Sequence, residues 1–211
     1  MLRSAGPRPT YSATVSAHEP TAEVPETFRT ALASVRGVQP RPEILIEEAP
    51  APQRLAPYSL ALTADVVDDD RDIATGRFVV LHDPDGHETW DGTFRVVTFT
   101  RADVEADIAS DPFAHEVGWS WLVDALQAQR CGFTMLGGTV TRVASQSFGE
   151  LDDRPDEAHL EVRASWTPTD AAGRPGLAAH LQAWLDLLAT GAGLAPLPPG
   201  VRAIPSQPRR R

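Results

Sequence analysis

A cluster of histidines and carboxylates lies between residues 82 and 88, where two imidazoles and three acidic side chains fall within seven positions. His82 and His87 flank the tetrapeptide Asp83-Pro84-Asp85-Gly86, and Glu88 follows. Imidazole nitrogens and carboxylate oxygens are ligands of zinc and other divalent cations, so His82 and His87 are the candidate metal ligands of this sequence. The same segment has the composition of a tight turn, because proline fixes φ and glycine accepts a positive φ. The two histidines lack a defined ligand spacing, so we favour a polar turn and expect no bound metal.

A second group of acidic residues follows the first predicted strand. It comprises Asp65, Asp68, Asp69, Asp70 and Asp72. A calcium loop needs alternating oxygen ligands, a central glycine and a terminal bidentate acid. Arg71 interrupts the group and Gly76 comes late, so the pattern predicts a solvated acidic loop.

Cys131 is the single cysteine, so it cannot close a disulfide within the chain. It falls at the predicted C-terminal end of a helix, where the helix dipole opposes a thiolate, and we interpret it as a boundary residue. No Gly-x-Ser-x-Gly, P-loop or dinucleotide-binding pattern occurs, since Gly137 and Gly138 lie inside a strand pattern. The sequence therefore supplies no catalytic residue, and we expect no cofactor.

Four arginines fall one each on four predicted strands, namely Arg77, Arg95, Arg142 and Arg163. Arg163 alternates with the apolar residues of its own strand and is therefore expected to face water. If all four share the solvent face, they form a cationic strip that suits an anion or an acidic peptide. The alternative is ordinary cross-strand pairing with acidic neighbours such as Glu161 and Asp91.

The tryptophans are expected to divide into two kinds. Trp119, Trp121 and Trp184 lie on predicted helices that carry apolar stripes, and aromatic residues at such positions are more often core residues than ligand-stacking ones. Trp90 precedes Asp91 and Gly92 at a strand start, where cover is less obvious, so we expect it to be partly exposed. It is a candidate binding residue beside the arginines.

The first half of the chain predicts one helix and three strands. A helix begins near Pro25, carries Phe28, Leu32 and Val35 on one face, and ends at Gly37. Residues 44–46 form at most a short edge strand, because prolines follow them closely. Residues 58–66, 77–82 and 93–100 then form a meander of three strands, with the turn at residues 83–86 between the second and the third.

The second half predicts a helical insert, a hairpin and a final helix. Thr100 and Asp103 resemble a cap for a short helix, and Asp111-Pro112 resembles the start of the next helix, which stops at Gly132. Strands at residues 133–148 and 160–166 pair as a second hairpin. The final helix carries the apolar stripe Leu177, Leu181, Trp184, Leu185 and Leu188.

These elements predict a two-layer α+β domain with about five antiparallel strands covered by three amphipathic helices. The element order is helix, three strands, helix, two strands, helix. We expect a tail at residues 1–22, one domain at residues 23–195, and a second tail rich in proline and arginine at residues 196–211. No stretch is apolar for long enough to suggest a signal peptide or a membrane span, so we expect a cytoplasmic protein without a membrane partner.

Composition limits the class of partner. Of the 211 residues, 42% are hydrophobic and 23% are charged, which is ordinary globular usage. The 19 basic residues, all arginine, are set against 29 acidic residues and leave a net charge of -10. An acidic protein of this kind repels a phosphate backbone, so nucleic acid is not expected as a general partner.

Three segments carry a resemblance to a known family. They are Leu81-His82-Asp83-Pro84, the block Glu116-Val117-Gly118-Trp119-Ser120-Trp121-Leu122, and Leu136-Gly137-Gly138-Thr139-Val140-Thr141. Together they resemble an uncharacterised family of actinobacterial proteins with a domain of unknown function, over approximately residues 25–195. The resemblance implies no reaction, cofactor or residue role. The element order alone is similar to that of type III secretion chaperones, which implies a non-enzymatic protein that binds its partner through an open sheet or helix face.

The sequence therefore predicts a non-enzymatic protein-binding domain, of the adaptor or chaperone kind, whose partner is another protein or a second copy. One alternative is an enzyme or small-ligand binder with a pocket between the helical insert and the sheet, lined by Trp90, His82 and His87. A further alternative is an RNA-associated protein that uses the arginine strip, which a steep salt dependence of RNA binding would reveal. No feature identifies a small-molecule ligand.

Overall fold

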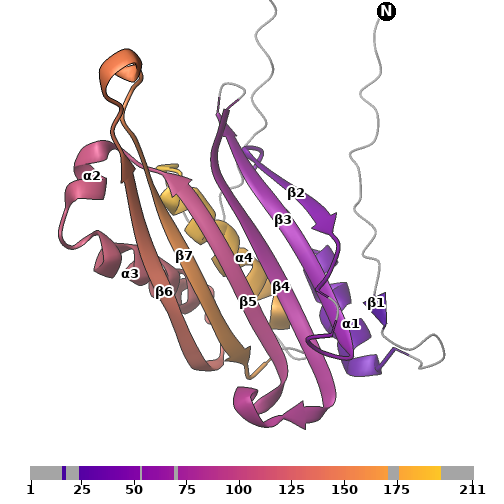
Figure 1. Cartoon of the computed structure of the whole chain (residues 1–211). Coiled ribbons are helices and arrows are strands. Elements are labelled where there is room, and N and C mark those ends of the chain that lie inside the picture. The colour runs from indigo at the N-terminus through magenta and orange to yellow at the C-terminus, as the bar shows by residue number, and fades with distance from the viewer. Residues whose placement is uncertain (1–15, 18–23, 53, 69–70, 171–175, 196–211) are drawn as a thin grey trace, which may run out of the picture.

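The structure of the protein is a computed structural model that describes residues 16–17, 24–52, 54–68, 71–170 and 176–195 (Figure 1). Within these residues, one antiparallel sheet carries a layer of helices on one face. The strands are β1 Ser16–Ala17, β2 Ile44–Ala49, β3 Tyr58–Asp68, β4 Arg71–His87, β5 Gly92–Asp103, β6 Phe133–Ser145 and β7 Glu157–Pro168. The helices are α1 Glu26–Arg36, α2 Ala106–Ser110, α3 Ala114–Ala128 and α4 Gly176–Gly191, with short 3-10 turns η1 Glu88–Trp90 and η2 Gly149–Leu151.

The sheet has seven strands in the order β1-β3-β4-β5-β7-β6, and β2 pairs with β3 beside β1. Every pair is antiparallel. β3, β4 and β5 form the predicted meander, and β6 and β7 form the predicted hairpin. The hairpin joins the meander through its second strand, so β7 lies between β5 and β6 and β6 lies at the edge.

Helix α4 lies at the centre of the helical layer, behind the middle strands (Figure 1). Its predicted stripe is fully buried, with Leu177, Leu181, Trp184 and Leu188 each 0% exposed. α1 contacts α4 on one side and α3 contacts it on the other, so nearly every turn of α4 is covered. The core is therefore built around the last helix.

Alternation along the strands separates the two faces of the sheet. On β3, β4, β5 and β7 the even-numbered residues face the helices and join the core, as Leu62, Phe78, Val96 and Val162 do. The odd-numbered residues lie on the opposite side, which we call the outer face. The predicted two-layer α+β class is confirmed, and the strand count is seven rather than about five because β1 and β2 extend the sheet.

The predicted turn at residues 83–86 is wrong. β4 continues to His87, and the register with β5 shifts between His82 and His87, so the segment is an irregularity within a strand. The Asp83 carboxylate accepts the backbone N–H of Asp85 at 3.1 Å, which gives the local bend that the composition suggested. The chain reverses later, through η1 and Asp91, whose φ is 52°.

The helix starts predicted for the insert are also displaced. Thr100 and Asp103 belong to β5, where Thr100 pairs with Gly76 and Val162, and α2 begins only at Ala106. α3 begins at Ala114 rather than at Asp111-Pro112. Asp111 still accepts a hydrogen bond from the backbone N–H of Phe113 at 2.8 Å, just before the helix.

Most of both predicted tails lies outside the described residues. Ser16 and Ala17 are described, and they pair with Ser59 and Tyr58 of β3 although they fall in the predicted tail. Of the predicted acidic loop, Asp69 and Asp70 lie outside the described residues, while Asp65 and Asp68 belong to β3. None of the described helices has the length and apolar character needed to cross a bilayer.

Candidate functional site

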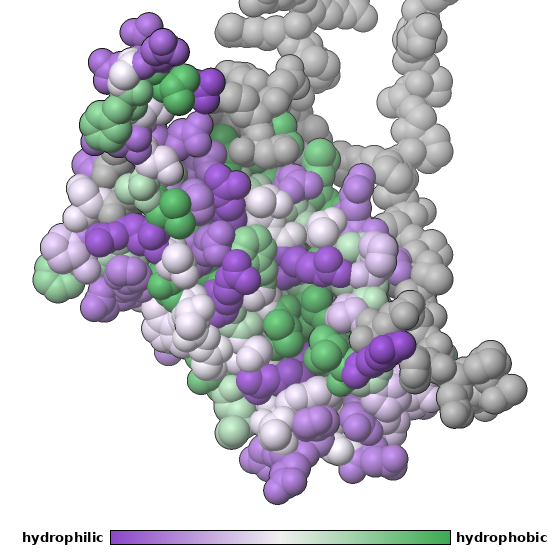
Figure 2. Space-filling model, viewed as in Figure 1, coloured by the Kyte–Doolittle hydropathy of each residue, from purple (hydrophilic) through white to green (hydrophobic). Residues whose placement is uncertain are grey.

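The outer face of the sheet carries no helix in the part of the chain that the structure describes (Figure 1). Figure 2 shows this face, with apolar residues gathered over the middle strands and hydrophilic residues around them. One part of the apolar group is a small cluster of Ala61, Val79, Leu81 and Trp90, against which Ala49, Ala51 and Ala56 pack. The remaining part is open to solvent.

A row of small and apolar residues crosses the outer face from strand to strand. Its members, paired in register, are Ala61, Val79, Val97, Ser165 and Gly137. The chain after β2 covers the first two members, which are buried. Val97 is 37% exposed, so the row opens to solvent from β5 onward. We call these five residues the middle row.

Arginines stand on both sides of the middle row. The neighbouring row on one side holds Arg77, Phe99 and Arg163, which are cross-strand partners in that order. The neighbouring row on the other side holds Leu81 and Arg95. Three of the four predicted arginines thus share the outer face and flank one apolar row.

Arg95 is held by three hydrogen bonds to uncharged groups. Its Nη1 donates to the backbone carbonyl of Met135 and to the hydroxyl oxygen of Thr167, both at 3.1 Å, and its Nη2 donates to the Ser165 hydroxyl at 2.7 Å. Among the described residues, no carboxylate forms an ion pair with it. Partial burial lowers the pKa of Arg95, because desolvation penalises the charged form and no nearby charge compensates.

The carbonyl that Arg95 uses comes from an unusual backbone position. The β6–β7 register shifts between Thr134 and Gly137, and Met135 at this bulge has a φ of 50°. A residue with a Cβ adopts this left-handed conformation at a cost of about 1 to 2 kcal/mol. The bulge turns the Met135 carbonyl toward Arg95 and leaves the Met135 side chain 53% exposed.

The other two arginines of the predicted strip that lie on the outer face have different surroundings. The Nη2 of Arg163 donates to Glu161 at 2.8 Å, and its guanidinium lies 4.8 Å from the centre of the Phe99 ring. This ion pair is the ordinary pairing that the sequence left open. Arg77 donates to the backbone carbonyl of Pro50, which ties β4 to the segment after β2.

Arg142 lies on the other face of the sheet. It pairs with Leu160, a core-facing residue of β7, and its Nη1 donates to the backbone carbonyl of Asp111 at 2.7 Å. Arg142 therefore fixes the connection between α2 and α3. The predicted strip of four arginines is wrong in this member, because the side-chain alternation of β6 turns Arg142 toward the helices.

The aromatic and histidine candidates do not meet at one site. Trp90 is buried rather than partly exposed, and its indole stacks on the His87 ring at 4.3 Å. His82 lies in the core instead, where its ring stacks on Phe94 at 4.1 Å and on Phe28 at 5.5 Å. The predicted pocket lined by Trp90, His82 and His87 is therefore not formed. No cluster of potential metal ligands occurs among the described residues, these two histidines included.

Burial perturbs the pKa values of one core residue, His82, and of the partly buried Cys131. Desolvation lowers the pKa of His82, although the Thr93 carbonyl and Asp83 oppose this shift. Burial raises the pKa of Cys131 to about 12, and the charges of Asp170 and Asp186 add to the effect. The Cys131 thiol is thus protonated near neutral pH, which agrees with its interpretation as a boundary residue.

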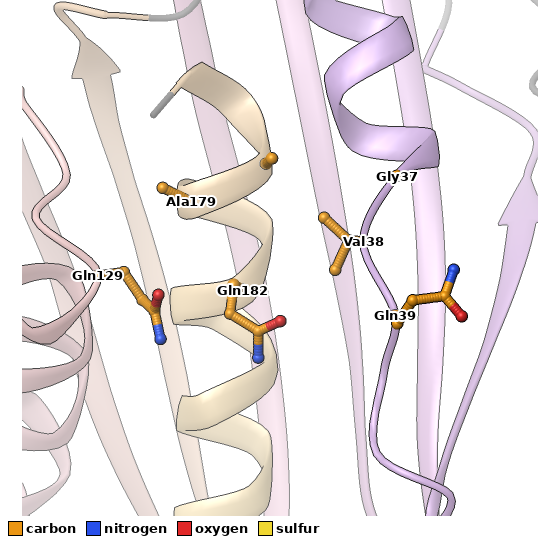
Figure 3. Close-up of a pocket in the computed structure, with 7 residues that line it drawn as sticks. Gly37, Val38, Gln39, Gln129, Ala179 and Gln182 are labelled. Carbon is orange, nitrogen blue, oxygen red and sulfur yellow. The ribbon is translucent and has the colours of Figure 1, made fainter. Parts of the chain in front are cut away.

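A hollow of about 460 Å³ lies on the helical side of the molecule. Figure 3 shows that its lining residues come from three segments: Gly37 to Gln39 after α1, Gln129 after α3, and α4 with Ala178, Ala179 and Gln182. The amides of Gln129 and Gln182 donate to Asp186 at 2.6 and 2.9 Å. The lining itself holds no ionisable side chain, and it lies apart from every predicted site residue.

The sequence did not single out Met135, Ser165 or Thr167. Ser165 and Thr167 could have been found from their places between the apolar residues of β7, which put them on the same face as Arg163. The sequence gave no sign of the left-handed backbone at Met135, because glycine or asparagine usually occupies such a position.

Comparison with known proteins assigns the chain to a family. The model of a family described as "Protein of unknown function (DUF3000)" matches residues 24–202. No curated protein and no solved structure matches the chain. The resemblance to a family with a domain of unknown function is confirmed over the whole predicted range, while the actinobacterial origin and the likeness to secretion chaperones remain predictions.

Proposed function

The chain belongs to this family of unknown function, and we propose that it is a non-enzymatic protein-binding domain that works as an adaptor. Its binding surface is the outer face of the sheet, from the exposed part of the middle row to the arginines beside it. The partner is an acidic polypeptide segment that also carries apolar side chains.

The observation that carries this proposal is the setting of Arg95. A guanidinium that is partly desolvated without a counter-ion is unfavourable, since charges removed from water are normally paired. Here the charge is kept in place by neutral acceptors, among them the backbone carbonyl of the exposed Met135, and it lies on the same strand and face as the exposed Val97. An acidic and apolar segment would satisfy both features at once.

Charge supports the same class of partner. The whole protein has a net charge of -10, so an acidic partner is repelled at most approaches. Arg77, Arg95 and Arg163 make the outer face an exception to this general repulsion. Electrostatic steering would therefore orient an acidic segment toward this face and make association dependent on salt.

The alternatives have weaker support. A small-molecule site would use the hollow beside α4, but two of the three glutamine amides in its lining, those of Gln129 and Gln182, are already hydrogen-bonded to Asp186. An RNA would approach a molecule of net charge -10 through the outer-face arginines, of which Arg163 is paired with Glu161 and Arg101 with Asp103. Neither a small molecule in this hollow nor an RNA would supply both a counter-ion for Arg95 and apolar contacts for Val97 and Met135.

A peptide selection tests the proposal. The full chain is immobilised, exposed to a library of random peptides at low salt, and washed. We expect enrichment of peptides that combine Asp or Glu with apolar residues, and an affinity that falls as salt rises. Val97→Asp should abolish binding, while Val117→Asp, an equally exposed valine on α3, should leave it intact.

Val97→Thr accompanies Val97→Asp, because threonine keeps the shape and strand preference of valine and should weaken binding without loss of fold. Enriched peptides that bind Val97→Asp as well as the parent would overturn the outer-face proposal. A structured RNA of random sequence that binds more tightly than the peptides would favour the RNA alternative. Self-association that competes with peptide binding would make a second copy the partner.

A further inference from the structure

We infer that Arg95 is the receptor for one carboxylate group of the bound polypeptide, at a site completed by Ser165, Gly137 and Met135. This inference rests on the proposed function and makes it specific, since it assigns one position of the outer face to one chemical group. We call these four residues the carboxylate site.

The free donors of Arg95 set the chemistry of the site. A guanidinium has five N–H donors, and the three hydrogen bonds to Met135, Thr167 and Ser165 use three of them. The Nε hydrogen and one Nη2 hydrogen have no acceptor among the described residues. Two free donors on one planar cation match the two oxygens of a carboxylate.

The site is formed before any ligand arrives. Ser165, Thr167 and Met135 fix the guanidinium from two strands, and the left-handed backbone of Met135 is what presents its carbonyl to Nη1. Because the cation is already oriented, little side-chain entropy remains to be lost on binding. Thr167 is itself fixed, since its hydroxyl donates to the backbone carbonyl of Trp90.

Space for the ligand lies above Gly137. Gly137 pairs with Ser165, and a Cβ built there meets nothing within 4 Å. Gly138 points the other way, where a Cβ would lie 2.9 Å from the Cα of Ala164 and 2.9 Å from the Trp119 ring. The fold therefore requires Gly138 but does not require Gly137, and the absence of a side chain at Gly137 leaves room beside Ser165 and Arg95.

The neighbours of Arg95 explain why the carboxylate comes from a polypeptide. Val97 is exposed two residues along the same strand and face, and the exposed Met135 supplies its backbone carbonyl to the cation, which suits a carboxylate carried on methylene or methyl groups. No described carboxylate forms an ion pair with Arg95, and Glu161 of the same face is already engaged by Arg163 and lies 3.8 Å from the His159 ring nitrogen. The carboxylate is therefore supplied by the partner, either as an acidic side chain or as a chain terminus.

Side-chain NMR of the full chain tests the carboxylate site. The Nε–Hε signal of Arg95 is followed during separate titrations with N-acetylglutamate α-amide, N-acetylalanine and N-acetylglutamine α-amide. We expect a saturable shift with at least one of the two carboxylates and none with the glutamine compound. The first two probes distinguish a side-chain carboxylate from a terminal one.

Matched variants locate the effect. Arg95→Lys keeps the charge but loses the planar donor pair, so its affinity for the carboxylate probe, measured by the backbone amide shifts of Ser165 and Gly137, should fall by about tenfold or more. Gly137→Leu should remove binding while the fold is kept, because its side chain would occupy open space. Arg154→Gln, on the exposed turn between β6 and β7, should change nothing.

The outcomes separate this inference from the proposed function. If the Arg95 signal does not shift, yet selected peptides still bind the parent and not Val97→Asp, the carboxylate site is wrong and the docking face stands. If inorganic phosphate shifts the signal at lower concentration than either carboxylate, the assignment to a carboxylate is wrong. If the carboxylates bind but the library yields no peptide, the carboxylate site stands and the proposed function falls.

Discussion

The indole N–H of Trp166 donates to Nδ1 of His180 at 3.0 Å, inside the core. An indole nitrogen can only donate, so Nδ1 is unprotonated and the imidazole carries its hydrogen on Nε2. That hydrogen is donated to the Asp170 carboxylate at 2.9 Å. The chain of two hydrogen bonds connects β7 to α4 through a neutral histidine.

Stability should decrease as the pH falls below neutrality. Burial lowers the pKa of His180 in spite of Asp170, and burial also lowers the pKa of His82. The unfolded chain, with histidine near its ordinary value of 6.5, takes up protons first. Above pH 6.5 the two neutral imidazoles make their full contribution to the free energy of unfolding. This contribution decreases as the pH falls from 6.5 toward the lower pKa values of the folded state. Urea unfolding at about pH 7.5 and about pH 5.5 should show the lower free energy of unfolding at the acidic pH.

His180→Gln removes one of the two buried imidazoles and should therefore reduce the difference between the two pH values, whatever its effect on stability at neutral pH. His115→Gln replaces an exposed histidine of α3 and serves as the control. A parent protein that is more stable at the acidic pH would contradict the proposed role of the buried histidines. A His180→Gln variant whose free energy of unfolding differs between the two pH values as much as that of the parent would contradict it too.

Leu185→Ala should lower the free energy of unfolding by about 2 to 5 kcal/mol, because Leu185 is 1% exposed in the central helix and its truncation leaves a cavity. Leu45→Ala makes the same chemical change at an exposed position of β2 and should cost less than about 1 kcal/mol. Chemical denaturation of both variants measures the comparison. Equal losses would mean that α4 does not carry the core.

The glycine pair of β6 should respond asymmetrically to alanine. Gly138→Ala places a methyl group against the Ala164 backbone and the Trp119 ring and should cost about 1 to 3 kcal/mol or more. Gly137→Ala places its methyl group in open space, at a backbone position whose φ is not positive. It should leave the free energy of unfolding unchanged or raise it by about 0.5 kcal/mol, because alanine reduces the conformational entropy of the unfolded chain. Thermal unfolding of both variants tests this, and a reversed order would place the wrong glycine against α3.

Cys131 should resist alkylation in the native protein. Its pKa of about 12 leaves almost no thiolate at neutral pH, and the thiolate is the reactive form. Iodoacetamide followed by mass spectrometry should show modification only after denaturant is added. Rapid labelling without denaturant would show that the thiol is neither buried nor held protonated.

Much of the fold was predictable from periodicity. The alternation of residues 58–66 and the stripe of α4 predicted elements whose buried residues are the observed ones, because both periods are set by which face meets the core. Element ends were less predictable. Residues 83–86 have turn chemistry, yet the strand continues through them, since tertiary pairing of His87 with Gly92 outweighs local preference. Thr100 resembles a helix cap but is held in β5 by two neighbouring strands.

The candidate site was predictable only in part. Arg163 could be placed from its own strand, whose alternation is clean. Arg142 could not, because β6 holds a bulge and two glycines and its apolar residues do not mark one face. The features that distinguish Arg95 are a carbonyl 40 positions away and two hydroxyls 70 and 72 positions away, and such long-range contacts leave no local pattern.

The central place of α4 has a consequence for biosynthesis. α4 is the last described element, and β7, which lies between β5 and β6, is the strand made just before it. While the ribosome is still translating, the meander has neither its neighbour on the β5 side nor the helix that fills its apolar face. The nascent chain therefore completes its core only when α4 has left the exit tunnel, and until then the apolar face of the meander is exposed to aggregation.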